Sequence, residues 1–237
     1  MKAILSANSW YYDDIFKFWA AKSSENKTSL LGVPHGGNYL VQNNFPNKEH
    51  EIEIVDDYYS WGEDDCNKPE KVRTMPAPKL MRIKRAKEKN SKNGILWVTT
   101  SSPRYLLHQD VFTRNFLNYL QWHVRFLKIF PDKLLPDLLV RAHQEDFGWG
   151  IVARIQEIVP DLKIDTWNTS FRKRLEESRL YVCDHLSTTY IEALASNNPT
   201  ILFWDPLLYN LTPKAVKYFE ALHICGILHY SPESAVR

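Results

Sequence analysis

The chain has 237 residues, of which 44% are hydrophobic, and this is enough apolar material for one large core or two modest ones. Its 30 basic and 28 acidic residues leave a net charge of +2, which gives no overall field for binding nucleic acid. The three cysteines show no CxxC spacing, so neither a disulfide framework nor a zinc site is indicated.

The sequence contains no apolar run of the length that spans a bilayer. Asp13, Asp14 and Lys17 stand where a signal peptide would need an apolar core. We therefore expect a cytoplasmic protein in a reducing compartment, with peripheral contact to the inner membrane left open.

The N-terminal third begins with a pattern typical of a β–α–β unit. Apolar runs at 2–7 and 28–34 predict two strands, and apolar side chains recur at helical spacing between about 13 and 24. A third strand is predicted at 51–55, where EIEIV alternates between acidic and apolar residues. These elements predict part of a Rossmann-like domain over residues 1–65.

Candidate site residues follow two strands of this domain. His35 stands in PHGGNY, where Gly36 and Gly37 would let the backbone approach a ligand closely, although a turn with a structural histidine explains the motif as well. Asp56 and Asp57 follow the predicted third strand and could supply a nucleophile or a base. Carboxylates at such positions are also common on plain surfaces.

The segment from 66 to 93 is expected to be a linker. It contains Pro76 and Pro78, and between 71 and 94 nine basic residues stand against a single acid, Glu88. A run of this kind is either a solvated connector or a surface that contacts anionic membrane, and both interpretations stay open.

From residue 94 to 237 strands and helices alternate, which predicts a second Rossmann-like domain. Strands are expected at 94–100, 134–143, 161–166, 180–183, 200–204 and 226–230. Helices are expected at about 110–129, 149–158, 170–177, from the loop at 187–189, and at 213–222. The fold class is therefore α/β, with a parallel, doubly wound sheet whose ligands bind beyond the carboxyl ends of the strands.

The strongest single signal lies in residues 179–206. A buried strand leads into a loop with Ser187, Thr188 and Thr189, and a helix carrying Glu192 begins there. Backbone N–H groups and the helix dipole at such a point favour a phosphate or a carboxylate. The alternative is an ordinary helix N-cap, in which a hydroxyl and Glu192 serve only the first turn.

Further polar side chains follow the neighbouring strands and should gather at the same edge of the sheet. They are Ser101, Ser102 and Arg104 after the first strand, Arg141 and His143 after the next, Asp184 to Thr189 after the strand at 180–183, and Asp205 after the strand at 200–204. An arginine, several hydroxyls and a helix N-terminus on one edge suit a nucleoside phosphate. For Arg141, a salt bridge to a nearby carboxylate is the competing interpretation. The nearby carboxylates are Asp137, Glu145 and Asp146.

The chain lacks GxGxxG, a Walker loop, a GxSxG elbow and HExxH, which disfavours dehydrogenases, P-loop kinases, α/β-hydrolases and zincins. Five blocks stand in order along it: YDDIFKFWAA, PHGGNY, HEIEIVDDYYSWG, LLVRAHQEDFGW and DHLSTTYIEALASNNPTILFWDP. Together they resemble a family of bacterial surface-carbohydrate transferases that are GT-B-like and distantly similar to the retaining β-Kdo transferases, which use a CMP-activated sugar.

The resemblance implies roles for the residues already singled out. The nucleotide and its phosphate would be held by Arg141, His143, Ser187, Thr188, Thr189 and Glu192. The loop residues expected near the sugar are Gly36, Gly37 and Ser102. His35 and Asp56 would face the sugar from the first domain, with Asp56 as the attacking carboxylate and Asp57 as its rival.

The function expected is transfer of a sugar from a nucleotide-activated donor, with CMP as the carrier that the resemblance suggests, to a surface polysaccharide or a lipid-linked glycan. No metal and no cofactor are expected, since the nucleotide-sugar is a substrate. A nucleotide-sugar epimerase and a non-catalytic nucleotide-sugar binding or assembly module are the alternatives. The chain begins partway through the first domain and stops at Ser231-Pro232-Glu233, where another helix should start, so we expect a C-terminal portion whose activity alone is in doubt.

Overall fold

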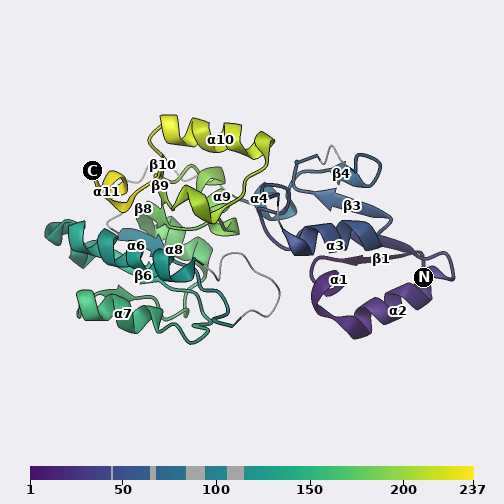
Figure 1. Ribbon diagram of the computed structural model, residues 1–237, viewed down its shortest axis with the longest axis horizontal. Helices are drawn as coiled ribbons and strands as arrows, with labels where there is room; N and C mark the ends of the chain where they lie inside the picture. Colours follow the sequence, from purple (N-terminus) through teal and green to yellow (C-terminus); the bar gives the residue numbers. More distant parts are fainter. Residues whose placement is uncertain (44, 65–67, 84–93, 106–114) are drawn as a thin grey trace. The chain divides into compact units, whose positions relative to one another are not determined.

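The computed structural model describes residues 1–43, 45–64, 68–83, 94–105 and 115–237 (Figure 1). The chain divides into two compact units. The first consists of Met1–Ile83 with Asn210–Ala215, and the second of Lys84–Tyr209 with Val216–Arg237. Each unit has its own parallel sheet.

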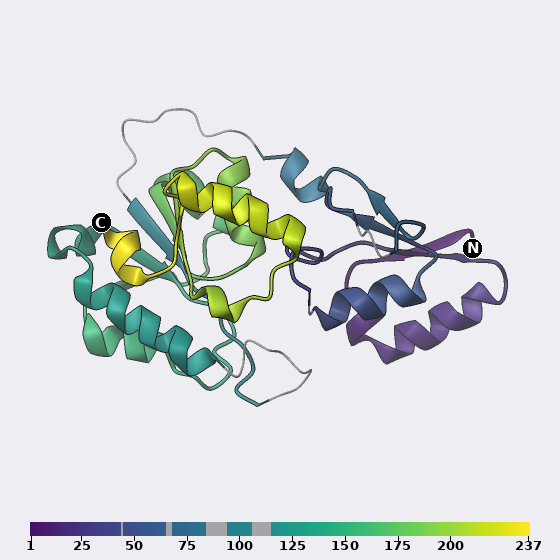
Figure 2. The same ribbon diagram turned by 45° about the horizontal axis from the view of Figure 1, so that its top comes forward.

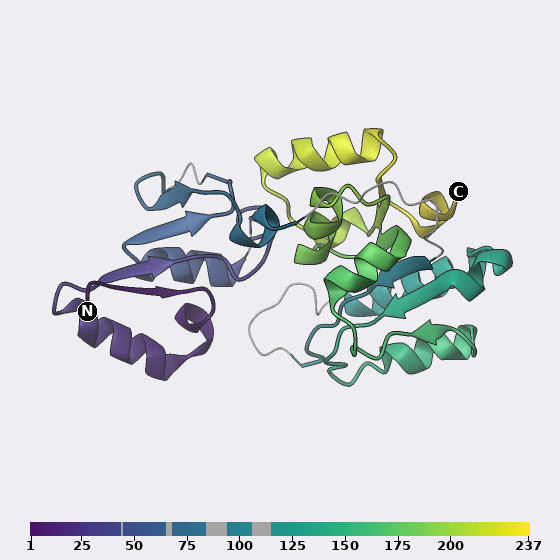
Figure 3. The ribbon, with the colours of Figure 1, turned by 180° about the vertical axis from the view of Figure 1, so that it is seen from behind.

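The first unit is built on a four-stranded sheet of order β1-β2-β3-β4. Its strands are β1 (Ala3–Ser6), β2 (Ser29–Gly32), β3 (Asp57–Ser60) and β4 (Val72–Thr74), and its helices are α1 (Ser9–Tyr12), α2 (Asp14–Ser24), α3 (Pro46–Ile54) and α4 (Pro78–Met81). Ile4, Trp10, Ile52 and Tyr58 are part of a core between the sheet and helices α1 to α3. Figure 3 shows these strands in front of helix α3.

The predicted β–α–β unit is confirmed by β1, α2 and β2, but the strand predicted at 51–55 is wrong. This stretch ends helix α3, which has a proline in its first turn, a position that suits proline. Glu51, Ile52 and Val55 are all buried, which is the spacing of one helix face. Over five residues EIEIV fits the helical period as well as the strand period, and packing on the sheet decides between them.

The linker predicted at 66–93 is wrong over its first part. Val72–Thr74 forms β4, which pairs in parallel with β3, and Pro78–Met81 forms α4. The Lys71 ammonium donates to the carbonyl of Glu53 at 2.7 Å, so the fold uses this basic residue. A three-residue edge strand carries too little apolar pattern to be recognised in the sequence. The rest of the basic run, residues 84–93, lies outside the described residues.

The second unit has a six-stranded sheet of order β10-β9-β8-β5-β6-β7. The strands are β5 (Gly94–Val98), β6 (Leu138–Arg141), β7 (Lys163–Ile164), β8 (Ser178–Cys183), β9 (Thr200–Phe203) and β10 (Leu228–His229). The helices are α6 (Phe116–Ile129), α7 (Ile151–Ile158), α8 (Phe171–Glu177), α9 (Thr188–Ala195), α10 (Pro213–Ile224) and α11 (Pro232–Val236), with short 3₁₀ turns at Asp132–Asp137 and Pro206–Leu208.

This strand order is that of a doubly wound Rossmann sheet. β5, the first strand of the unit, is central, β6 and β7 follow on one side, and β8, β9 and β10 follow on the other. Helices α6, α7 and α11 cover one face, and α8, α9 and α10 cover the other (Figure 2). The parallel, doubly wound sheet predicted from the alternation of elements is therefore confirmed. The strand predicted at 134–143 is shorter than expected, because residues 132–137 form a 3₁₀ helix.

The close approach of β2 to β3 gives a first testable prediction. A Cβ on Gly32 would lie 2.6 Å from Cδ2 of Tyr58, whose ring is fully buried and cannot move aside. We expect Gly32→Ala to lower the free energy of unfolding of the first unit by about 1–3 kcal/mol, the usual cost of overpacking. Urea unfolding followed by circular dichroism measures the change.

Gly94→Ala is the matched control, because a Cβ there would meet its nearest neighbour at an ordinary 3.9 Å. Equal unfolding midpoints for the wild-type chain and Gly32→Ala would contradict the proposed clash.

Candidate functional site

The carboxyl edge of the second sheet holds most of the predicted site residues. β5 and β8 lie side by side at its centre, and the chain leaves β5 toward α6 on one face and leaves β8 toward α9 on the other. Doubly wound sheets bind their ligands where two neighbouring strands diverge in this way. The loops that begin at Thr99 and at Asp184 therefore frame the candidate site.

A single buried carboxylate, Asp184, stands at the start of the second loop. It is 1% exposed. Trp97 Nε1 donates to Oδ2 at 2.9 Å, and Tyr119 Oη donates to Oδ1 at 2.7 Å. His123 Nε2 lies 2.9 Å from Oδ2, and His185 Nδ1 lies 2.9 Å from Oδ1. Strand β5, helix α6 and the loop after β8 are thus all tied to one side chain.

The charge state of this cluster follows from its neighbours. Burial alone would raise the pKa of Asp184, but attraction to His123 and His185 and their hydrogen bonds lower that pKa to about 2. Burial alone would lower the pKa of His185, but its contacts with Cys183 and Asp184 raise that pKa to about 10. Asp184 and His185 therefore form a buried pair of opposite charges at neutral pH.

The Asp184 cluster also fixes the first loop. The Tyr119 hydroxyl that donates to Asp184 accepts a hydrogen bond from the backbone N–H of Thr100 at 2.8 Å. Two residues on, the carbonyl of Ser102 accepts from Trp149 Nε1 at 2.8 Å. Ser102, expected near the sugar, is only 3% exposed, so it contributes to the shape of the loop through its backbone.

The loop with Ser187, Thr188 and Thr189 leads into α9 without a side-chain N-cap from Ser187. The alternative interpretation, an ordinary helix N-cap, would need one. Ser187 occupies the N-cap position, but its side chain makes no capping hydrogen bond. Its Oγ lies 2.6 Å from Thr189 Oγ1, which accepts from Tyr181 Oη at 2.8 Å. The hydroxyls of Ser187 and Thr189 are thus linked at the carboxyl edge, where the dipole of α9 favours an anion.

Glu192 and Thr188 share one face of α9, since they are one helical turn apart. Glu192 is 5% exposed, which excludes an ordinary solvated carboxylate. The structure thus brings Ser187, Thr188, Thr189 and Glu192 together as the sequence predicts, while their part in binding a nucleotide stays a prediction.

Arg141 has a different place from the one expected. It is 4% exposed, and its Nη1 forms an ion pair with Asp165 and donates to the carbonyl of Thr169 at 3.0 Å. The Arg141 and Arg174 guanidinium groups hold the pKa of Asp165 below its usual value, although burial of the carboxyl opposes this. We therefore assign Arg141 to a structural ion pair and correct its predicted phosphate role. The competing interpretation, a salt bridge from Arg141, is confirmed, but the partner is Asp165. It is not one of the predicted carboxylates Asp137, Glu145 and Asp146.

His143 is exposed two residues after β6. Its Nδ1 lies 3.0 Å from the backbone N–H of Glu145, and its ring packs against Phe147 at a centroid distance of 5.7 Å. These contacts orient the imidazole at the carboxyl edge, so His143 remains a candidate for the nucleotide site.

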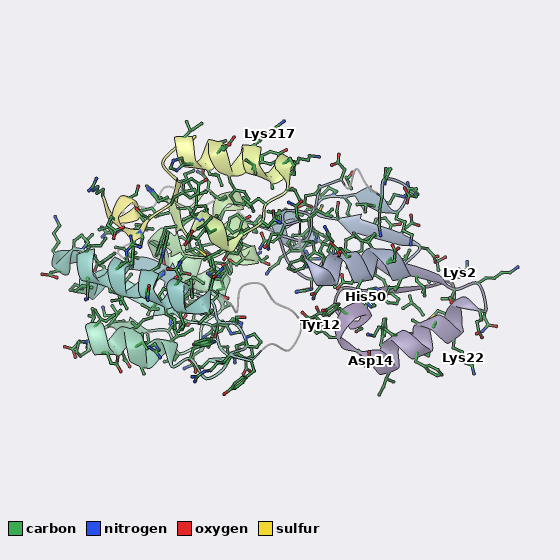
Figure 4. The ribbon with its side chains drawn as sticks, viewed as in Figure 1. Lys2, Tyr12, Asp14, Lys22, His50 and Lys217 are labelled. Carbon is green, nitrogen blue, oxygen red and sulfur yellow. The ribbon has the colours of Figure 1, made fainter. Side chains whose placement is uncertain are left out.

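In the first unit, His35 follows β2 at the carboxyl edge, as predicted, and the residue as a whole is exposed. Tyr12 of α1, labelled in Figure 4, packs edge-on against the His35 ring, with 6.4 Å between the two ring centroids. Gly36 and Gly37 follow His35 in this loop, and the close approach of their backbone to a ligand stays a prediction. In the same loop Asn38 has a positive φ of 81°.

A chain of hydrogen bonds connects His35 with a buried acid that the sequence did not reveal. The Tyr39 hydroxyl contacts His35 Nδ1 and donates to Glu51 Oε1 at 3.3 Å. Tyr58 Oη donates to Glu51 Oε2 at 3.4 Å, and Glu51 is 0% exposed. We missed Glu51 because a strand over 51–55 would have turned it toward solvent. The proline that begins α3 was the available signal.

The hydrogen-bonded chain of His35, Tyr39 and Glu51 can hold a proton near neutral pH. Burial raises the pKa of Glu51 to about 8, although the hydrogen bonds from Tyr39 and Tyr58 oppose the rise. Partial burial lowers the pKa of His35, against a hydrogen bond to the backbone of Ala7. A neutral acid and a neutral imidazole joined through a tyrosine hydroxyl are suited to general acid and base chemistry.

Asp56 does not lie where a nucleophile was expected. It precedes β3, and its Oδ2 accepts from the N–H of Leu30 at 2.8 Å near the start of β2. This is the amino edge of the sheet, opposite the edge that carries His35. Its rival Asp57 pairs with Arg73 at 3.0 Å. The placement of both aspartates after a strand is therefore wrong, because the preceding segment is helix α3.

Neither a membrane span nor a metal cluster is found among the residues described. No helix in that part of the chain has both the length and the apolar character needed to cross a membrane. Likewise, no three His, Cys, Asp or Glu side chains there gather as a metal site would require.

The whole sequence, residues 1–237, matches the model of a family described as LIC12162 family transferase. This chain belongs to that transferase family. No curated protein matches it. Its expected identity as a transferase is therefore confirmed at this level.

Several solved structures are similar to this chain at low sequence identity. A protein from Listeria monocytogenes assigned as a UDP-N-acetylglucosamine 2-epimerase has a TM-score of 0.52 and 15% identity, over 99% of this chain and 64% of its own. The chain thus spans less than two thirds of that protein. The pneumococcal O-GlcNAc transferase GtfA, solved with UDP and GlcNAc, has a TM-score of 0.45 and 12% identity, over 80% of this chain and 40% of its own.

MurG from Acinetobacter baumannii has a TM-score of 0.42 and 13% identity, over 91% of this chain and 58% of its own. The scores for GtfA and MurG are too low to support any argument from those two proteins. The predicted fold class, α/β with parallel, Rossmann-like sheets, is confirmed by the observed sheets together with the likeness to the Listeria protein.

The Asp184 pair predicts how acid affects the second unit. Because the pKa of Asp184 is depressed in the folded state, its stabilisation is present above its usual value of 3.8 and is lost as pH falls through about 2. Asp184→Asn leaves the buried His185 without its charged partner. We expect a loss of about 3–5 kcal/mol at pH 7, measured by urea unfolding.

Asp161→Asn, at an exposed carboxylate of the same unit, is the control and should change little. A loss below about 1 kcal/mol for Asp184→Asn would mean that the cluster does not hold the two loops.

Glu51 predicts the opposite pH dependence for the first unit. Because its pKa is raised in the folded state, its stabilisation is present below the usual value of 4.5 and is lost as pH rises through about 8. The free energy of unfolding should fall across this window in the wild-type chain. Glu51→Gln should remove the fall, and Glu49→Gln, at an exposed residue of the same helix, should retain it. Parallel profiles for the wild-type chain and Glu51→Gln would refute the assignment.

Proposed function

We propose that this transferase binds a nucleotide-activated sugar through its second unit and transfers the sugar to a glycan acceptor. The observation that carries the proposal is the strand order of the second sheet, which puts the 184–187 loop and the start of α9 at the point where β5 and β8 diverge. Membership of a transferase family supports group transfer as the reaction class.

The chemistry proposed is substitution at the anomeric carbon of the donor sugar. The bond from that carbon to the phosphate oxygen breaks, a bond to an acceptor hydroxyl forms, and the nucleoside phosphate leaves with the bonding electrons. Ser187, Thr188 and the dipole of α9 would stabilise the negative charge that develops on the leaving phosphate. Arg141 has no part in this step, because its guanidinium is held by Asp165.

The proton of the acceptor hydroxyl needs a base. His35 is the candidate in the first unit, since the residue is exposed and its Nδ1 contacts the Tyr39 hydroxyl, which donates to Glu51. A neutral imidazole can accept the proton, and the hydrogen-bonded chain through Tyr39 to Glu51 would hold the ring in place. Asp56 is not retained as a nucleophile, because it lies at the amino edge of its sheet.

The finer identity of the substrates rests on the resemblance stated above. It favours a CMP-linked donor and an acceptor that is a surface polysaccharide or a lipid-linked glycan at the cytosolic side of a membrane. The basic segment 71–94 would add attraction to anionic lipid, although Lys71 and Arg73 are already engaged within the fold.

Nucleotide binding is the most direct test. We expect one of CMP, CDP, UDP and GDP to raise the melting temperature in a concentration-dependent way. Ser187→Ala and Thr188→Val should each weaken that nucleotide by about 1.5–3 kcal/mol, or about 10- to 100-fold, the usual range for a hydrogen bond to a charged group. Isothermal titration measures the affinities.

Ser196→Ala, at the other end of α9, is the matched control and should bind like the wild-type chain. If no nucleotide shifts the melting temperature, the proposal is wrong. Release of UDP from UDP-N-acetylglucosamine without an acceptor would favour the epimerase, and tight binding without any turnover would favour a binding module.

A further inference from the structure

Trp167, three residues beyond β7, is held from several directions. Its backbone N–H donates to Asp165 Oδ1 at 3.2 Å, and its indole Nε1 donates to the carbonyl of Ala142 at 3.1 Å. The guanidinium carbon of Arg141 lies 3.8 Å from the ring centroid, so it covers one face of the indole. The residue is nevertheless 41% exposed. Because Arg141 covers one face of the ring and the indole N–H is engaged, we take the opposite face to be the exposed one.

The support beneath the ring is rigid. Arg141 is 4% exposed and forms an ion pair with Asp165, whose side chain is 0% exposed and also accepts from Arg174 at 3.2 Å. Because these charges compensate one another out of solvent, Arg141 cannot swing away, and the indole keeps its orientation. A large flat apolar surface is thus presented to solvent in a fixed position.

The backbone of Trp167 is strained. Trp167 has φ 63°, in the left-handed region that bulky residues avoid. With 41% of the residue exposed, burial offsets only part of this strain. Residues held in such strained backbone conformations cluster at active sites and ligand clamps.

Trp167 also lies within reach of the phosphate site proposed above. Its contact with Ala142 places the ring at the end of β6, one strand from β5 and two from β8. With strands about 5 Å apart, the ring is about 10 Å from the end of β8, where α9 begins. A nucleoside phosphate whose phosphate is bound at α9 can extend its ribose and base along the edge over this distance.

We propose that the exposed face of the Trp167 indole is the stacking subsite for the nucleobase of the donor. The inference rests on the proposed nucleotide binding and adds where the base sits. A planar π surface backed by a cation suits a nucleobase, because stacking removes apolar area from water on both partners and every base has a flat face. Arg141 then acts as a positioning residue beneath the ring and does not touch the phosphate.

The test compares ligands with and without a base. The affinities of the tightest of CMP, CDP, UDP and GDP, and of ribose 5-phosphate, are measured by titration for the wild-type chain, Trp167→Ala and Trp167→Phe. We expect Trp167→Ala to bind the nucleotide about 5- to 100-fold more weakly, the range of base stacking on an aromatic side chain, and to bind ribose 5-phosphate unchanged. Trp167→Phe should retain most of the affinity.

Tyr218→Ala on α10 is the matched control, since Tyr218 is an aromatic residue of the same unit with 66% exposure. Labelling the eight tryptophans with 5-fluorotryptophan supplies a measurement that needs no alanine variant. The fluorine signal that Trp167→Phe removes should shift on addition of the nucleotide. A stationary signal, or full nucleotide affinity in Trp167→Ala, would overturn the subsite while leaving nucleotide binding in place. If the wild-type chain binds no nucleotide at all, the proposed function fails, and the subsite fails with it.

Discussion

The second unit depends on the hydrogen bonds and ion pairs that stabilise the buried charge of Asp184. Asp184 has given up water and is stabilised instead by Trp97, Tyr119, His123 and His185, which belong to three different elements. An ionised carboxylate in such a place is tolerated only if its donors stay in position. Its need for partners therefore fixes how β5, α6 and the loop after β8 meet, and so the shape of the edge where a ligand would bind.

The buried carboxyl group of the first unit, Glu51, is neutral at neutral pH, whereas Asp184 is ionised. Among the described residues, Glu51 contacts two tyrosine hydroxyls and no cation, so burial dominates and its pKa rises to about 8. Asp184 has two histidines, and its pKa falls to about 2. The difference suits two tasks: a fixed charge orders loops rigidly, whereas a group that titrates near neutrality can exchange a proton with its hydrogen-bonded neighbours.

The corrected positions of the predicted residues sharpen the functional hypothesis. Arg141 and Asp56 leave the set of residues expected to touch substrate, because one is buried in an ion pair and the other lies at the amino edge of its sheet. Ser187, Thr188, Thr189, Glu192 and His143 stay at the carboxyl edge of the second sheet, and Trp167 and Glu51 join the candidates. On this hypothesis, helix α9 and its hydroxyl groups would bind the phosphate of the nucleotide, and an aromatic face would bind its base.

The sequence by itself determined the alternation of strands and helices after residue 94, the parallel sheet that follows from it, and the place of the hydroxyl loop before α9, because these depend on local periodicity and on the short connections between elements. It could not decide whether 51–55 is strand or helix, since five residues fit both periods. The partner of Arg141 was equally hidden, because Asp165 is 24 residues away in sequence and meets it only when β6 and β7 pair. Glu51, Asp184 and Trp167 gain their roles from burial and from neighbours distant in the chain, and only the tertiary structure supplies those.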